Sequence, residues 1–142
     1  MATLASNTYS GLYELHNSGM HKDSRVIGNN TTSSIDRVTD IIIISLHGSD
    51  IVFLYPDGTI EFTLAGWPTV TTRERVNHFL RRTNAYVHQH KYEQFVSFGT
   101  GNDIKINSRD HYVVLGAGFG ESPNLYNGSY SSIDFSEIME GN

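Results

Sequence analysis

The chain has 142 residues, of which 38% are hydrophobic and 18% are charged, and its formal net charge is −5. The absence of cysteine from the sequence excludes disulfides, thiolate nucleophiles and cysteine-based zinc sites. The negative charge argues against a protein that binds duplex DNA by neutralising many phosphates. Because the apolar run from Ile41 to Leu46 is far shorter than a membrane span, we expect no membrane partner.

A chain of this length is expected to form a single domain, 1–142. Its composition predicts a sheet-helix core, 37–115, between two arms rich in Ser, Asn and Gly, 1–36 and 116–142. We expect the N-terminal arm to be flexible, with a short strand around Thr8–Leu15 as an option. The alternative is an arm that orders against a neighbouring subunit and buries its apolar residues, namely Tyr9, Leu12, Tyr13 and Leu15.

The core begins with three predicted strands. The β-branched run Asp40–Leu46 is typical of a central strand buried on both faces, and Ile51–Tyr55 is the next strand. The sequence Pro56-Asp57-Gly58 predicts a tight turn, because Pro fixes φ and Gly accepts a positive φ. Thr59–Leu64 alternates between apolar and polar residues, with Ile60, Phe62 and Leu64 on one face. These features indicate an antiparallel meander.

A helix is predicted over residues 72–82. Thr71 is a suitable N-cap, and Glu74 three residues later completes a capping box. Val76, Phe79 and Leu80 share one face at helical spacing, so that face is expected to pack on the sheet.

Four further strands follow in the sequence, and their predicted bounds are Tyr86–His90, Glu93–Phe98, Asp103–Asn107 and His111–Leu115. The last two are expected to form a hairpin across residues 108–110. The C-terminal arm contains four apolar side chains that are candidate anchors, Tyr126, Tyr130, Phe135 and Ile138. The predicted fold class is therefore α+β, with an antiparallel sheet of five to seven strands and one main helix packed on it.

The predicted helix concentrates positive charge in an acidic protein. Four of the seven arginines lie within ten residues, at positions 73, 75, 81 and 82. Arginine suits bidentate recognition of phosphate, and the backbone N–H groups beside Thr71 and Thr72 form a potential anion site. Trp67, just before the helix, is a candidate stacking platform for a base. The alternative is a solvated arginine face with Trp67 in the core.

Other patterns give weaker signals. His88 and His90 lie on one face of a strand, and with His111 they form a conceivable zinc site, but surface or packing histidines are favoured. The sequence VVLGAGFG at 113–120 resembles a dinucleotide-binding motif, but Glu121 replaces the third glycine and no helix follows, so we predict a flexible turn there. No catalytic constellation is evident. We therefore expect a binding protein that is not an enzyme and has no metal or cofactor.

The segment GWPTVTTRERVN resembles a recurring pattern of small bacteriophage proteins, GW-x-T-x-TT-x-x-R-x-N. The pattern is filled by Gly66, Trp67, Thr69, Thr71, Thr72, Arg75 and Asn77. The resemblance covers roughly residues 45–98, and it departs from the pattern where Pro68 replaces the common basic residue. Most of that group has no assigned function. The resemblance implies a sheet hairpin, a helix and further strands.

The size and layout are also similar to those of the Thoeris anti-defence sponge family of phages. That family binds a cyclic ADP-ribose isomer made by TIR-domain proteins without cleaving it. The resemblance implies a homo-oligomer in the host cytoplasm. It also implies that Arg75, Arg109 and Thr72 hold phosphate. The other implied ligand contacts are base stacking by Trp67 or Phe98 and hydrogen bonds to ribose or base edges by Asn77 or Asn107.

Two other functions remain open from the sequence. One is a virion or assembly protein that uses its polar arms as contacts. The other is a single-stranded nucleic acid binder with aromatic residues interleaved among basic ones, against which the net acidity counts.

Overall fold

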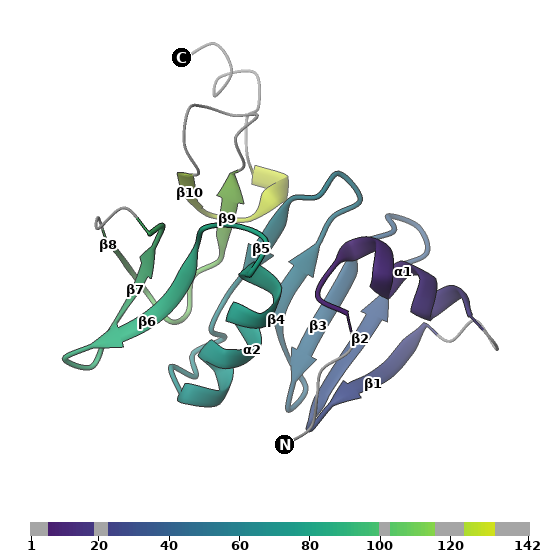
Figure 1. Ribbon diagram of the computed structural model, residues 1–142, viewed down its shortest axis with the longest axis horizontal. Coiled ribbons are helices and arrows are strands. Elements are labelled where there is room, and N and C mark those ends of the chain that lie inside the picture. The colour runs from purple at the N-terminus through teal and green to yellow at the C-terminus, as the bar shows by residue number, and fades with distance from the viewer. Residues whose placement is uncertain (1–5, 19–22, 100–102, 116–123, 133–142) are drawn as a thin grey trace, which may run out of the picture.

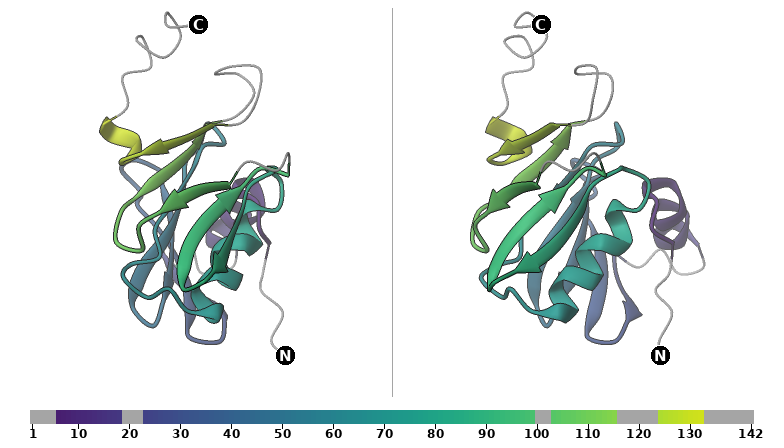
Figure 2. Two further views of the ribbon diagram at one scale, coloured as in Figure 1. Left: turned by 90° about the vertical axis from the view of Figure 1, so that its left-hand side faces the viewer. Right: turned by 60° about the vertical axis from the view of Figure 1, so that its left-hand side comes forward.

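The computed structural model describes residues 6–18, 23–99, 103–115 and 124–132, and these form an α+β fold. Within these residues, a seven-stranded sheet and a three-stranded sheet accompany two α-helices, α1 (Tyr9–Asn17) and α2 (Val70–Leu80). Both helices lie on the same side of the large sheet, and the small sheet lies beside α2 (Figures 1 and 2). No helix in the described part of the chain is long and apolar enough to cross a membrane. The predicted fold class is confirmed.

The large sheet is antiparallel throughout, in the order β1-β2-β3-β4-β5-β9-β10. Its strands are β1 (Ser24–Gly28), β2 (Thr31–Ile35), β3 (Ile42–Leu46), β4 (Ser49–Leu54), β5 (Ile60–Phe62), β9 (Tyr112–Leu115) and β10 (Asn124–Asn127). The small sheet contains β6 (Tyr86–His90), β7 (Glu93–Ser97) and β8 (Asp103–Ile106). The predicted meander is confirmed as β3, β4 and β5.

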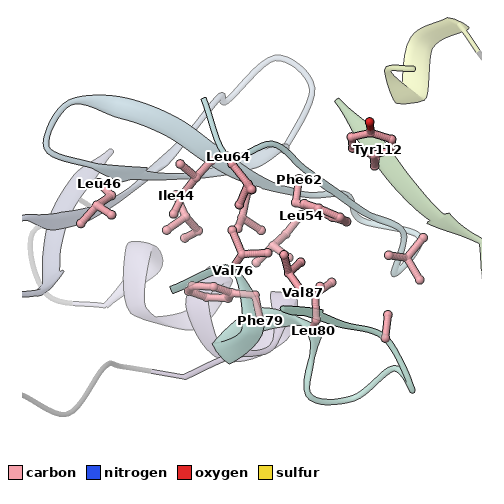
Figure 3. Packing of buried hydrophobic residues seen from close by; sticks show 14 of the residues in the cluster. Ile44, Leu46, Leu54, Phe62, Leu64, Val76, Phe79, Leu80, Val87 and Tyr112 are labelled. Carbon is pink, nitrogen blue, oxygen red and sulfur yellow. The ribbon is translucent and has the colours of Figure 1, made fainter. Parts of the chain in front are cut away.

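The core lies between the large sheet and the helices. Val76, Phe79 and Leu80 are fully buried, as predicted, and Figure 3 shows them meeting side chains of β3, β4 and β5, including Ile44 and Phe62. Period-two alternation in the strands and period-3.6 spacing in α2 both direct apolar groups into this layer. Burial of these side chains supplies most of the stabilising free energy.

Neither α1 nor α2 covers the second face of the large sheet, which corrects the prediction for β3. Ile42, Ile44 and Leu46 are buried, but the intervening Ile43 and Ser45 are half-buried on the opposite face. A strand buried on both faces needs covering elements on both sides. We call the side of the large sheet away from α1 and α2 the outer face.

Helix α2 starts two residues earlier than predicted. Its N-cap is Thr69, whose hydroxyl oxygen accepts a hydrogen bond from the Thr72 backbone N–H at 3.2 Å. The predicted capping box from Thr71 to Glu74 is therefore wrong. Both threonines offer the same capping oxygen, and Thr69 has the extended backbone that an N-cap requires.

The flexible arm predicted for 1–36 is wrong over much of its length. Thr8 caps α1 by accepting a hydrogen bond from the Gly11 N–H, so the option of a strand at Thr8–Leu15 is also wrong. Leu12 and His16 are buried at helical spacing, and His16 Nε2 lies 2.8 Å from Ser33 Oγ on β2. The arm packs on its own chain because α1 has a narrow apolar face that matches the sheet.

The predicted hairpin between the last two strands is also wrong, because β8 and β9 belong to different sheets. The chain leaves β5 for α2, and β9 later fills the open edge of β5, with Glu61 opposite Val113. Beyond β9, the C-terminal arm contributes β10 and a short 3₁₀-helix, η2 (Tyr130–Ser132). The turn expected near Phe119 and the anchors Phe135 and Ile138 lie outside the described residues.

Candidate ligand-binding face

The outer face aligns a row of aliphatic, aromatic and acidic side chains from four strands. In the sheet register, Ile43 lies opposite Phe53, Phe53 opposite Glu61, and Glu61 opposite Val113. These residues occupy the positions that alternate with the core positions, and therefore point away from the helices. The row of side chains crosses β3, β4, β5 and β9.

Glu61 is the centre of this row. It is only 3% exposed, although it carries an ionisable carboxyl group on the face of the sheet away from α1 and α2. Its Oε1 accepts hydrogen bonds from the Tyr55 hydroxyl and from the Tyr130 backbone N–H, both at 2.8 Å. Its Oε2 lies 2.6 Å from Nδ1 of His111. A buried carboxylate requires such partners, because an unpaired buried charge is strongly unfavourable.

Tyr130 joins the C-terminal arm to this network. Its ring stacks on Tyr55 with centroids 4.0 Å apart, and its hydroxyl donates to the Asp57 carboxylate. Burial raises the pKa of Tyr55, and its hydrogen bond to Glu61 raises that pKa further. Burial alone would raise the pKa of Asp57, but hydrogen bonds from Tyr130 and Thr59 outweigh burial and lower it. Asp57 therefore stays ionised, and both tyrosines stay protonated.

A cavity of about 770 Å³ lies over this network, and we call it the tyrosine cavity. Its walls include Ile43, Phe53, Tyr55 and Tyr130, and the Glu61 and His111 side chains border it. A volume of this size falls in the usual range for small-molecule sites.

A second depression of about 670 Å³ adjoins the first, and we call it the arginine depression. Trp67 and Arg109 line it together with Gly66 and Asp50, and His111 borders both hollows. Gly66 has a φ of +79°, and a Cβ added there would meet the Arg109 Cγ at 3.7 Å. The tight turn at Gly66 therefore brings the Trp67 segment close to the loop that carries Arg109.

Trp67 is 62% exposed, so it is not a core residue. Within the described residues, no hydrogen bond or ion pair of the Arg109 guanidinium is present. An exposed indole beside an available guanidinium offers one stacking surface and one anion-binding group. Of the residues predicted from the sequence, these two are the pair that the fold brings together on the outer face.

The start of α2 borders a third hollow of about 410 Å³, lined by Trp67, Thr71 and Thr72. Thr71 is exposed, but Thr72 is buried, and both its N–H and its hydroxyl are hydrogen-bonded to Thr69. The cap therefore already uses the Thr72 N–H that was expected to face an anion.

Of the other predicted residues, Arg75, Asn77 and Phe98 lie apart from this cluster, and Asn107 contacts it through Arg109. Arg75 Nε donates to Thr31 Oγ1 at 3.0 Å on the helix-covered side. Asn77 forms two hydrogen bonds with the Val87 backbone, at 2.9 and 2.7 Å, and so ties α2 to β6. Phe98 packs against the core, and the exposed Asn107 accepts a hydrogen bond from the Arg109 N–H.

The histidines considered for zinc do not converge. His88 lies in β6, 3.5 Å from Asp103, whereas His111 pairs with Glu61 in the large sheet. Among the described residues, no group of three or more His, Asp or Glu could hold a metal ion.

Sequence reasoning missed Glu61, Tyr55 and Phe53 as site residues. The available signal was the alternation in β5, which places Glu61 and Phe62 on opposite faces of the sheet. On the neighbouring strand β4, Phe53 is the residue paired with Glu61. An acidic residue inside a three-residue strand between apolar neighbours needs a partner. That partner, His111, is 50 residues away in the sequence, so spacing alone could not identify it.

The fold and the two adjoining hollows define a small α+β protein with an open, ligand-sized sheet face. A family model described as Kyanoviridae Gp96 protein matches residues 13–120. The chain belongs to this family, and it is therefore a bacteriophage protein. Comparisons with curated proteins and with solved structures give no match.

Proposed function

We propose that this phage protein binds a cyclic nucleotide immune signal on its outer face and sequesters it without cleavage. The cyclic ADP-ribose isomer made by TIR-domain proteins is the proposed ligand, and inhibition of Thoeris-type immunity in the host cytoplasm is the proposed result. The observation that carries the proposal is the exposed Trp67 beside Arg109 in a depression that adjoins a larger cavity.

The chemistry of the arginine depression supports a phosphorylated ligand. Arginine offers several N–H donors in a planar fork that matches phosphate oxygens, and His111 adds a second polar nitrogen group at the border. Trp67 adds a flat apolar surface against which part of the ligand can pack. Together the two hollows are large enough for a ligand of nucleotide size.

We prefer sequestration over cleavage because His111, the candidate acid–base group, is hydrogen-bonded to Glu61 and, within the described part of the chain, not to a nucleophile. Among the described residues, the side chain of His111 makes hydrogen-bond contact with Glu61 and with no serine or threonine hydroxyl. General acid–base catalysis of phosphodiester cleavage needs a positioned nucleophile or a second acid in addition to such a pair. The arrangement therefore favours a group that orients and holds a ligand.

We also propose that the protein forms a homo-oligomer. β1 is an edge strand of the large sheet, and Val26 on it is 78% exposed. An exposed edge strand is suited to pairing with another chain. Light scattering after size-exclusion chromatography tests this part, and a monomer at all concentrations would contradict it.

The test of function is recovery of the ligand. The purified protein is incubated with cyclic ADP-ribose isomers, separated from free ligand and heated, and the released material is identified by mass spectrometry. Release of the intact isomer is expected. Release of an altered product would mean an enzyme, and no retained ligand would contradict the proposal.

A further inference from the structure

The tyrosine cavity and the arginine depression differ in the charged residues that line them, because Arg109 lines the depression beside Asp50. None of the described residues that line the tyrosine cavity is Lys or Arg, whereas three of them are the acidic residues Asp36, Asp57 and Glu61. A phosphate placed there would meet like charge at close range, which is strongly unfavourable. The anionic part of a ligand is therefore directed to Arg109, beyond His111.

The walls of the tyrosine cavity favour a flat ring. Phe53 is half-buried, and its ring centroid lies 5.5 Å from that of His111. Tyr55 and Tyr130, which also line the cavity, form a stacked pair with an interplanar angle of 16°. Aromatic walls of this kind stabilise an inserted ring through stacking and burial of apolar surface.

The carboxylates determine which edge such a ring presents. Asp36 is exposed at the rim, and Oδ1 of its carboxylate accepts a hydrogen bond from the Val38 N–H, which leaves capacity at Oδ2. Carboxylates accept hydrogen bonds and donate none when ionised. An amino group on the ring is therefore attracted to this rim, whereas a carbonyl oxygen there is repelled.

We propose that the tyrosine cavity binds an amino-substituted heteroaromatic ring that belongs to the same ligand whose phosphate Arg109 holds. The inference rests on the proposed function and adds to it the class of the second ligand group. The ligand is thus a phosphorylated compound that carries an aminated base, and His111 lies at the junction of its two parts. A ring with a carbonyl in place of the amine is discriminated against.

The test compares three probes by isothermal titration calorimetry: adenosine 5′-diphosphate, inosine 5′-diphosphate and ribose 5-phosphate. The first two differ in the ring amine, and the third has phosphate but no base. Each probe is titrated into the wild-type protein and three variants. Phe53→Leu removes an aromatic wall and Arg109→Gln removes the proposed anion group. Tyr86→Leu is a matched control on the small sheet, and thermal melting checks that each variant is folded.

The proposal predicts that adenosine 5′-diphosphate binds about tenfold or more tightly than inosine 5′-diphosphate. Phe53→Leu weakens the binding of adenosine 5′-diphosphate by about tenfold and leaves the affinity for ribose 5-phosphate unchanged. Tyr86→Leu changes neither affinity. Arg109→Gln weakens the binding of all three probes. Equal binding of the two diphosphates, with no effect of Phe53→Leu, would overturn the ring assignment but leave the anion site intact. No binding of any probe would overturn both.

Discussion

His111 Nδ1 lies 2.6 Å from Glu61 Oε2, and this contact joins a loop residue to the centre of the outer face. Because Glu61 also accepts from Tyr55 and Tyr130, its carboxylate connects β5 with the residue after β4, the residue before β9 and the C-terminal arm. The same pair lies where the tyrosine cavity and the arginine depression meet. Glu61 is therefore central to both the stability of this face and its proposed function.

Replacement of Glu61 tests this role. Glu61→Gln removes the charge that accepts three hydrogen bonds and places an amide N–H₂ near other donors. We expect a loss of about 1–3 kcal/mol in the free energy of unfolding, measured by urea denaturation. Glu93→Gln is the control, because Glu93 forms an exposed pair with Lys105, and we expect it to change stability by less than about 1 kcal/mol. Equal effects of the two substitutions would contradict the structural role of Glu61.

The capping of α2 gives a second prediction. Thr69→Ala removes the oxygen that accepts the Thr72 N–H, and we expect a loss of about 1 kcal/mol. Thr71→Ala, in the exposed first turn, is expected to change stability by less than about 0.5 kcal/mol. Thermal or urea unfolding of both variants measures the difference. A larger loss from Thr71→Ala would restore the cap predicted from the sequence.

The contact between Tyr130 and Asp57 predicts a pH dependence in acid. The pKa of Asp57 is lowered in the folded protein, so folding favours the ionised carboxylate. This contribution to stability is fully present above the ordinary pKa of 3.8 and is lost as pH falls through the lower folded value. Tyr130→Phe removes one cause of the shift and should reduce the loss of stability between about pH 5 and pH 2. Identical acid unfolding curves for wild type and Tyr130→Phe would contradict this.

In alkaline solution the pH dependence of stability has the opposite sign, because Tyr55 makes stability decrease as pH rises. The pKa of Tyr55 is raised by burial and by its hydrogen bond to Glu61, so the folded state retains a proton that the unfolded state loses. Its contribution is fully present below the ordinary pKa of 10.0 and decreases as pH rises above that value. Tyr55→Phe should flatten the decrease in stability above about pH 10, measured by urea denaturation in a pH series. If the free energy of unfolding of Tyr55→Phe decreases with pH as steeply as that of the wild type, the buried hydrogen bond is contradicted.

Arg75 and Arg109 were both expected from the sequence to hold phosphate, but the structure leads us to expect that only Arg109 affects ligand binding. Arg109 lies in the arginine depression, whereas Arg75 lies on the helix-covered side and donates to Thr31. Arg109→Gln should weaken binding of a cyclic ADP-ribose isomer by tenfold or more, and Arg75→Gln should leave it within about twofold. Calorimetric titration with both variants provides the comparison. Loss of binding only in Arg75→Gln would move the site to the helix.

The sequence predicted the parts of the fold that depend on local pattern. A continuous β-branched run located β3, period-two alternation located β5, and helical spacing identified Val76, Phe79 and Leu80 as the buried face of α2. Local signals failed where two equivalent residues competed, as for the Thr69 and Thr71 caps. They also failed for the N-terminal arm, where the few apolar side chains of α1 gain their stability from packing on the sheet rather than from the helix itself.

Long-range pairing explains what the sequence could not predict about the site. Glu61 and His111 meet because β9 pairs with β5 rather than with β8. Trp67 and Arg109 share a depression because the Gly66 N–H donates to the Ser108 carbonyl at 2.8 Å. Neither contact leaves a local pattern, since both depend on which strand occupies the open edge of β5.

Mapping of amide chemical shifts by NMR tests whether the outer face binds the ligand. A ¹⁵N-labelled sample is titrated with a cyclic ADP-ribose isomer. We expect the shifts to concentrate at Phe53, Arg109, His111 and the Trp67 indole, with little change in α1 or in the buried side of α2. Shifts confined to α1 and α2, or no shift at saturating ligand, would contradict it.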